Sequence, residues 1–96
     1  MQIQPFHTKV EKMIQIKLGV IVLEHPSGFP HSDSNLYCIN SSDKIVWKAE
    51  KPEPNTLFTR VRANEDGDTL SAYTIGGHAS ELELKTGKLI SHTSIK

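Results

Sequence analysis

Two stretches of this sequence follow the same plan, and this internal repeat limits the possible folds more than any other feature. Residues 35–47, NLYCINSSDKIVW, align with residues 79–91, ASELELKTGKLIS, and the turn in the second stretch is one residue longer. The matched pairs are Leu36 with Ala79, Ile39 with Leu82, Asn40 with Glu83, Asp43 with Gly87, Lys44 with Lys88, Ile45 with Leu89 and Val46 with Ile90. Upstream, residues 20–23 correspond to residues 70–73. Short repeats of this kind indicate stacked units of supersecondary structure.

Both halves have the pattern of β-strands separated by turns. The apolar runs are rich in β-branched residues, and residues 79–84 alternate between apolar and polar side chains with a period of two. No segment has convincing helical periodicity. The expected strands cover residues 13–23, 35–40, 44–50, 57–63, 69–75, 79–84 and 88–95. We predict an all-β fold of two antiparallel meander sheets that cover each other's apolar faces, because a lone hairpin is only marginally stable.

The length of 96 residues allows one domain with one core. Two prolines near the middle of the chain cannot donate to a central β-ladder, so they indicate a connector between the halves. We therefore predict a single domain over residues 1–96. Its parts are an N-terminal segment at 1–12, a first β repeat at 13–50, a connector at 51–56 and a second β repeat at 57–96.

The repeat resembles the PQQ-like β-propeller repeat, in which a strand, an acidic or Asn residue, a turn ending in Gly and a strand ending in Trp follow one another. ELKTGKLIS is similar to its second half, and NLYCINSSDKIVW is similar to the same unit, with Asp43 at the turn and Trp47 at the signature tryptophan. The resemblance covers about residues 18–48 and 57–93. It implies sheets like propeller blades, arranged as a partial propeller or a small sandwich. Ser91 replaces the second tryptophan, and two blades cannot close a ring of at least about four.

Charge and composition exclude several classes of function. Eleven Lys and Arg balance eleven Asp and Glu, so no strong field favours nucleic acid. The longest apolar run, residues 18–23, is far shorter than the roughly 20 residues of a membrane helix. The first twelve residues lack the apolar centre of a secretory signal, and Cys38 has no cysteine to pair with. We expect a cytoplasmic protein that uses no cofactor and binds neither nucleic acid nor membrane.

The loop expected at residues 24–34 carries the candidate binding residues. Phe29 is an apolar ring expected at the tip of this loop, which points to contact with another molecule. His25, His31 and Asp33 lie in the same loop. We predict a partner-binding site formed by Phe29, His31, Asp33 and His25.

The residues favour binding over catalysis. The serines near the loop histidines lack a GxSxG elbow, so they do not indicate a hydrolase. We predict a non-enzymatic β-repeat module that acts through contact with a protein partner or with a second copy of itself. The alternative is a small-ligand or metal-binding domain that uses His25, His31 and His78 at one end of the sheets. Neither a C-x₂-C nor an H-x₃-H pair, the close ligand spacings common in zinc sites, occurs in the sequence.

Three further features are expected to be structural. Cys38 lies within a strand, where a buried thiol behaves as a small apolar residue. The sequence NEDGD, residues 64–68, fits a hairpin turn better than a calcium loop, because the calcium-binding Glu is missing. Trp47 is expected to pack one sheet against the other, and an interface anchor is the alternative.

Overall fold

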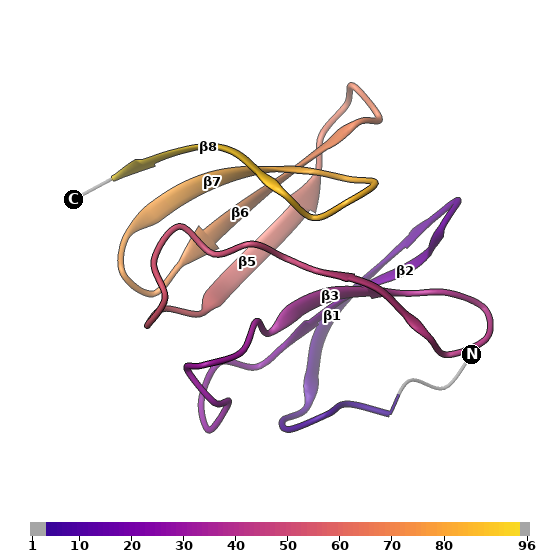
Figure 1. The fold of residues 1–96 in the computed structure, drawn as a ribbon, viewed down its shortest axis with the longest axis horizontal. Coiled ribbons are helices and arrows are strands. Elements are labelled where there is room, and N and C mark those ends of the chain that lie inside the picture. Colours follow the sequence, from indigo (N-terminus) through magenta and orange to yellow (C-terminus); the bar gives the residue numbers. More distant parts are fainter. Residues whose placement is uncertain (1–3, 95–96) are drawn as a thin grey trace.

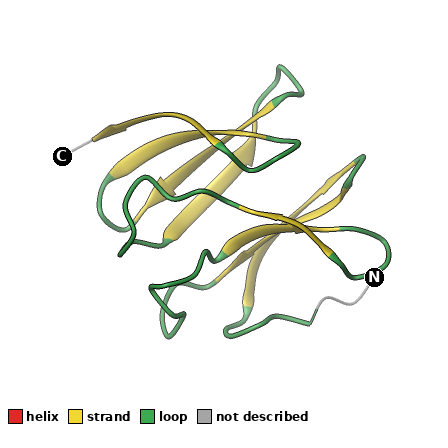
Figure 2. Cartoon of the chain, viewed as in Figure 1, coloured by secondary structure: helices red, strands yellow, loops and turns green. Residues whose placement is uncertain are grey.

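The chain folds into two four-stranded antiparallel meanders, as a computed structural model describing residues 4–94 shows (Figure 1). The first sheet, sheet 1, contains β1 (Val10–Ile16), β2 (Gly19–Glu24), β3 (Leu36–Ile39) and β4 (Ile45–Lys48). The second, sheet 2, contains β5 (Phe58–Ala63), β6 (Thr69–Thr74), β7 (His78–Glu83) and β8 (Leu89–Ser94). Every regular element in the described residues is a strand, so the all-β prediction is confirmed (Figure 2). The end expected near Ile95 lies outside the described residues.

The described residues contain no helix of the length and apolarity needed to cross a membrane.

The first half contains one more strand than expected, because residues 13–23 form a hairpin rather than a single strand. β1 begins at Val10, and a turn at residues 17–18 leads into β2. Gly19 makes this possible, since a Cβ at this position would lie 2.9 Å from the Cα of Asn40. The alternating part of the segment forms an edge strand, and the continuously apolar part forms β2, which is buried on both faces.

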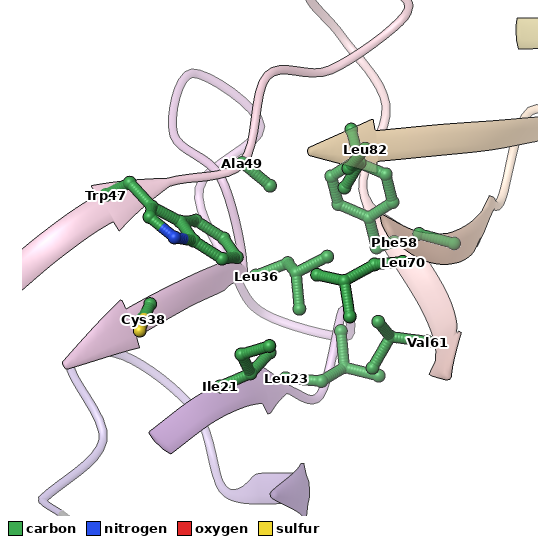
Figure 3. Packing of buried hydrophobic residues seen from close by; sticks show 11 residues of the cluster. Ile21, Leu23, Leu36, Cys38, Trp47, Ala49, Phe58, Val61, Leu70 and Leu82 are labelled. Carbon is green, nitrogen blue, oxygen red and sulfur yellow. The ribbon is translucent and has the colours of Figure 1, made fainter. Parts of the chain in front are cut away.

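The main core lies between the two sheets (Figure 3). It consists of Ile21, Leu23, Leu36, Cys38, Trp47 and Ala49 on the side of sheet 1, and Phe58, Val61, Leu70, Ala72 and Leu82 on the side of sheet 2. Each sheet therefore has an inner face, which turns toward the other sheet, and an outer face. The expectation that Trp47 packs between the sheets is confirmed, because its side chain belongs to this core and is only 6% exposed.

The expected hairpin turn at residues 64–68 is confirmed. Gly67 has a φ of 76°, a conformation that favours glycine. One carboxylate oxygen of Asp66 accepts hydrogen bonds from the backbone N–H groups of Asp68 (2.8 Å) and Thr69 (3.0 Å). Asp66 thus satisfies backbone donors in the turn between β5 and β6.

Candidate functional site

The loop between β2 and β3 does not present its predicted binding residues in the expected way. Phe29 is 3% exposed rather than free at a loop tip, and its ring meets that of His7 edge to face at 4.8 Å between centroids. His25 faces its own loop, where its Nδ1 accepts a hydrogen bond from the N–H of Ser27 (3.0 Å). The expected exposure of Phe29 was wrong because the N-terminal segment, distant in sequence, covers it.

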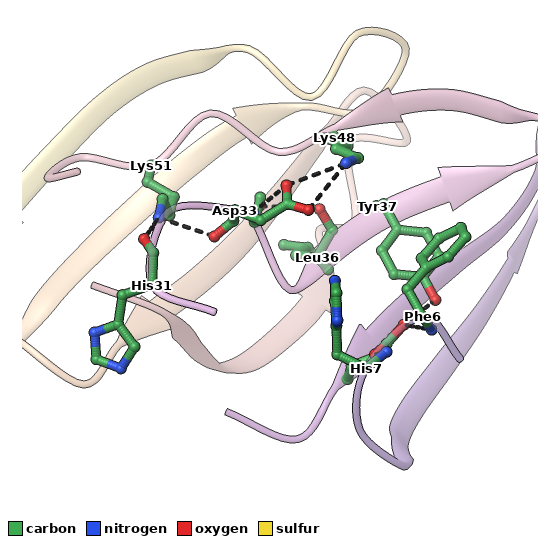
Figure 4. A network of polar contacts seen from close by, with 10 residues as sticks. Phe6, His7, His31, Asp33, Leu36, Tyr37, Lys48 and Lys51 are labelled. Carbon is green, nitrogen blue, oxygen red and sulfur yellow. Dashed lines mark hydrogen bonds and ion pairs between the residues drawn. The ribbon is translucent and has the colours of Figure 1, made fainter. Parts of the chain in front are cut away.

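His31 and Asp33 belong to a network that fastens this loop to the connector (Figure 4). The ammonium group of Lys51 donates to the carbonyl oxygens of His31 (2.7 Å), Asp33 (2.9 Å) and Pro54 (2.9 Å). The Asp33 carboxylate forms an ion pair with Lys48 at 3.0 Å. Burial raises the pKa of Asp33, but the hydrogen bonds and the nearby lysine lower it more, so the group stays ionised. These contacts give both residues a structural role.

The structure does not gather the three histidines of the alternative site. His31 Nδ1 lies 3.2 Å from the carbonyl oxygen of Asn55, whereas His78 Nε2 lies 2.8 Å from a carboxylate oxygen of Glu53. Within residues 4–94 no group of three or more His, Cys, Asp or Glu side chains is placed to hold a metal ion. The geometry therefore gives no support to a metal site among His25, His31 and His78.

Cys38 lies in the core, as expected, and its side chain has no exposed surface. Burial raises the pKa of its thiol. Because the thiolate is the reactive form, both the access to this cysteine and its ionisation are suppressed. The structure thus places Cys38 among the packing residues.

A buried carboxylate that the sequence reasoning assigned to the loop is the main polar centre of sheet 1. Glu24 ends β2 with no exposed surface. Its oxygens accept hydrogen bonds from the N–H groups of Phe6 (2.7 Å), His7 (3.0 Å) and Thr8 (3.0 Å), and from the hydroxyl of Tyr37 (2.5 Å). Three consecutive backbone donors and one phenol therefore bind a single carboxylate. This arrangement ties the N-terminal segment onto the outer face of sheet 1.

The ionisation of Glu24 and Tyr37 follows from these contacts. Burial by itself raises the pKa of Glu24, but its four donors together lower it below the ordinary value. The pKa of Tyr37 is raised by burial and by the hydrogen bond to, and the charge of, Glu24. Glu24 is thus a carboxylate and Tyr37 a neutral donor across the physiological range.

A second buried polar side chain joins the two sheets. Asn35 has no exposed surface, and its amide nitrogen donates to the carbonyl oxygens of Glu24 and Phe58, both at 2.7 Å. Its amide oxygen accepts the N–H of Phe58 at 2.8 Å. The amide side chain of Asn35 thus links the backbone at the end of β2 to the backbone at the start of β5.

Replacing Asn35 by alanine is expected to lower the free energy of unfolding by about 2 kcal/mol, because buried backbone groups lose their partners. Asn35→Asp should be no better, since it sets a carboxylate against two carbonyl oxygens. Chemical denaturation gives both values, with Asn55→Ala, a change at an exposed position, as the control. An Asn35→Asp variant as stable as the wild type would contradict this role.

The outer face of sheet 1 is largely apolar. Residues paired across neighbouring antiparallel strands project on the same side, which assigns to this face Val10, Met13, Val20, Val22, Tyr37, Ile39 and Ile45, together with the polar Gln15 and Lys48. The side chain of Phe6 lies over Tyr37, with their ring centroids 5.0 Å apart. Phe6 (51%), Met13 (52%) and Ile45 (42%) remain substantially exposed. The part of the N-terminal segment that the structure describes, from residue 4 on, therefore covers this face only in part.

Two hollows adjoin sheet 1. A pocket of about 190 Å³ on its outer face is bounded by Gln4, Phe6, Tyr37, Ile39 and Asp43. A wider, open groove of about 920 Å³ lies beside β1 and β5, with Glu11, Lys12, Arg60 and Arg62 among its lining residues. In this groove Lys12 already donates to the carbonyl oxygen of Val61 (2.8 Å). The groove also has apolar and aromatic lining at Leu23, Val61 and Tyr73, but it carries four charged side chains, whereas the smaller hollow carries one, Asp43.

The outer face of sheet 2 is polar by comparison. The strand pairing puts Arg60 opposite Tyr73, Arg62 opposite Ser71 and Glu81 opposite Ser91. Such a face is compatible with solvent, as is usual for one side of an antiparallel sheet. The two ends of the molecule therefore differ in chemical character.

Some of these features have a signal in the sequence. Glu24 continues the period of Val20 and Val22, so it belongs to the strand and to its outer face rather than to the loop. Phe6 is an aromatic residue within the segment expected at 1–12, and no pattern in that segment indicates what it covers. Asn35 directly precedes β3, but its partner Phe58 lies 23 positions away and only the fold brings them together.

The sequence matches no protein-family model, and comparisons with curated proteins and with solved structures also give no significant match. The likeness to PQQ-like repeats therefore stays a prediction.

Proposed function

We propose that this chain is a non-enzymatic module that acts through protein contact, and that its contact surface is the outer face of sheet 1. The observation that carries the proposal is the partial cover of this face. Large exposed apolar side chains surround a buried apolar centre, which is the arrangement of a surface that binds another protein.

The proposal moves the predicted contact from the loop to the sheet. The carbonyl of His31 binds Lys51 of the connector, the carboxylate of Asp33 pairs with Lys48 of β4, and Phe29 is covered by His7. The sheet face, in contrast, keeps aromatic and aliphatic surface available at Phe6, Met13 and Ile45. Aromatic side chains and methionine are enriched at protein interfaces, which supports this placement.

The test is site-specific photo-crosslinking in cells, with benzoylphenylalanine placed at Ile45. Matched probes stand at Ile75, which is 58% exposed in the turn after β6, and at His31 in the loop. We expect the probe at Ile45 to capture a specific protein, and the other two probes to miss it. The captured protein must then bind the purified wild-type chain.

Ile45→Lys should weaken that purified complex at least about tenfold, while Ile75→Lys should leave it unchanged. If the probe at His31 captured the protein and the probe at Ile45 did not, the contact surface would be the loop between β2 and β3 and not the sheet face. Equal binding by wild type and Ile45→Lys would show that the face is not the contact surface.

A further inference from the structure

The contact between Trp47 and sheet 2 gives a template for what the outer face of sheet 1 binds. The indole nitrogen of Trp47 donates to the carbonyl oxygen of Leu84 (3.0 Å), in the turn between β7 and β8. The ring lies against Gly87 so closely that a Cβ there would be 2.7 Å from Cδ2 of Trp47. An indole from one sheet thus sits on the turn of the next.

The turn between β3 and β4 in sheet 1 is one residue shorter than this turn, but it closes with corresponding hydrogen bonds. In sheet 2 the N–H of Glu83 donates to the carbonyl of Lys88 (2.8 Å), and in sheet 1 the N–H of Asn40 donates to that of Lys44 (2.9 Å). Within each turn there is a second backbone hydrogen bond: the N–H of Gly87 donates to the carbonyl of Glu83 (2.7 Å), and the N–H of Asp43 donates to the carbonyl of Asn40 (3.0 Å). The φ angles also agree, at 71° for Gly87 and 60° for Asp43. The aligned residues therefore occupy equivalent backbone positions.

The face beside each turn is equivalent as well. Leu70, Ala72 and Leu82 lie in the core on the inner face of sheet 2, and the repeat aligns them with Val20, Val22 and Ile39. These three residues lie on the outer face of sheet 1. Sheet 1 therefore presents outward the kind of surface that sheet 2 presents to sheet 1.

The small pocket lies at the corresponding place. Two of its lining residues, Ile39 and Asp43, are the counterparts of Leu82 and Gly87, and Phe6 and Tyr37 add aromatic walls. Leu84 directly follows Glu83, so its counterpart after Asn40 is Ser41. Counted from Asn40, the carbonyl of Ser41 corresponds in the alignment to the acceptor that Trp47 uses, in a turn that is one residue shorter.

We propose that the pocket bounded by Phe6, Tyr37, Ile39 and Asp43 receives an aromatic side chain, best an indole, from a strand of the partner's β-sheet. This inference rests on the proposed contact surface and specifies the chemistry of its partner. The partner's ring would lie on the β3–β4 turn of sheet 1, as Trp47 lies on the β7–β8 turn of sheet 2. Phe6 would flank the ring. Tryptophan is also the residue most typical of buried interface anchors.

A second copy of this chain does not fit this description. Its own Trp47 is buried, and the repeat places Ser91 at the matching position of sheet 2. The outer face of sheet 2, which would have to meet the pocket, carries Arg60, Arg62 and Glu81, and its aromatic residue Tyr73 is paired with Arg60. We therefore assign the ring to a tryptophan-bearing β-sheet other than the two described here.

The turn residue sets how deeply the ring enters. Gly87 has no Cβ, whereas Asp43 carries one in nearly the same backbone conformation. We expect Asp43→Gly to deepen the pocket and to relieve the positive φ of a non-glycine residue. The variant is thus predicted to bind an aromatic probe more tightly than the wild type.

The test is NMR titration of the isotope-labelled, full-length chain with N-acetyltryptophanamide. Saturable shifts are expected at the backbone amides around Phe6, Tyr37, Ile39 and Asp43, and N-acetylalaninamide should produce none. Asp43→Gly should bind roughly three- to tenfold more tightly, and Phe6→Ala should bind at least about threefold more weakly. Ile75→Ala is the matched control, because it removes an exposed apolar side chain elsewhere.

Shifts scattered over the surface, or equal binding by wild type, Asp43→Gly and Phe6→Ala, would overturn the inference. Concentration-dependent self-association that Phe6→Ala abolishes would also overturn it, because the occupant would then be a second copy. The titration needs no partner, so it fails separately from the crosslinking experiment. If a partner is captured at Ile45 but N-acetyltryptophanamide does not bind, the proposed contact surface is still supported. Only the proposal of an aromatic pocket is then refuted.

Discussion

Replacing Glu24 by alanine is expected to lower the free energy of unfolding by about 4 kcal/mol, because a fully buried acceptor of four hydrogen bonds disappears. The N–H groups of Phe6, His7 and Thr8 would lose their partner, and the phenol of Tyr37 would be left in an apolar setting. A domain of this size has a total stability of about 5–10 kcal/mol. The variant should therefore be close to unfolding at 37 °C.

Chemical denaturation at neutral pH measures this loss, and Glu81→Ala is the matched control. Glu81 is exposed on the outer face of sheet 2, so its removal should change the stability by less than about 0.5 kcal/mol. Glu24→Gln should fall in between, because its amide group still accepts hydrogen bonds but turns an N–H₂ toward one or more of the four donors. A Glu24→Ala variant as stable as Glu81→Ala would show that the carboxylate does not hold the N-terminal segment.

The same carboxylate predicts a pH dependence. The pKa of Glu24 in the folded chain lies below its ordinary value of 4.5, so the unfolded state binds a proton more readily. The stabilisation is thus fully present above about pH 4.5 and is lost as the pH falls through the lower, folded-state pKa. Glu24→Gln should lose less stability than the wild type over that interval. Denaturation curves between about pH 6 and about pH 3 measure the difference.

A structural feature of this chain can be predicted from the sequence when the residues that form it are close together in the sequence. The strand pattern is local, so β3 to β8 could be predicted from apolar period and turn residues. The hairpin at residues 17–18 was missed because its turn contains no glycine, proline or polar cluster and only Gly19, the first residue of β2, follows it. The burial of Phe29 and the role of Glu24 depend on contacts with residues 6–8, which no periodicity in the N-terminal segment indicates.

The repeat was the most informative part of the sequence for the candidate site. The alignment of the two halves pairs Asp43 with Gly87 and contains Trp47, but the predicted site was the loop at residues 24–34 and not these residues. It did not indicate which face of sheet 1 stays uncovered, because that depends on where the first residues lie. The alignment of the two halves therefore indicates the turn at Asp43. Only the fold shows that Phe6 lies over the neighbouring face of sheet 1.

Gly87→Ala is expected to lower the free energy of unfolding by about 4 kcal/mol, and Gly67→Ala supplies a control with the same backbone cost. Both glycines have positive φ, 71° and 76°, which costs a side chain about 1–2 kcal/mol. Nothing lies within 4 Å of a Cβ at Gly67, but a Cβ at Gly87 would push into the indole of Trp47. The additional 2–3 kcal/mol, roughly, is the expected cost of overpacking.

A double-mutant cycle separates the two contributions. In a Trp47→Leu background the ring that blocks the new methyl group is gone, so Gly87→Ala should cost only about 1–2 kcal/mol, close to the value for Gly67→Ala. The coupling energy between positions 47 and 87 should then be about 2 kcal/mol. If Gly87→Ala cost the same in both backgrounds, the indole would not rest on this glycine in solution. The template from which the aromatic pocket of sheet 1 is inferred would then be lost, whereas strong coupling would support it.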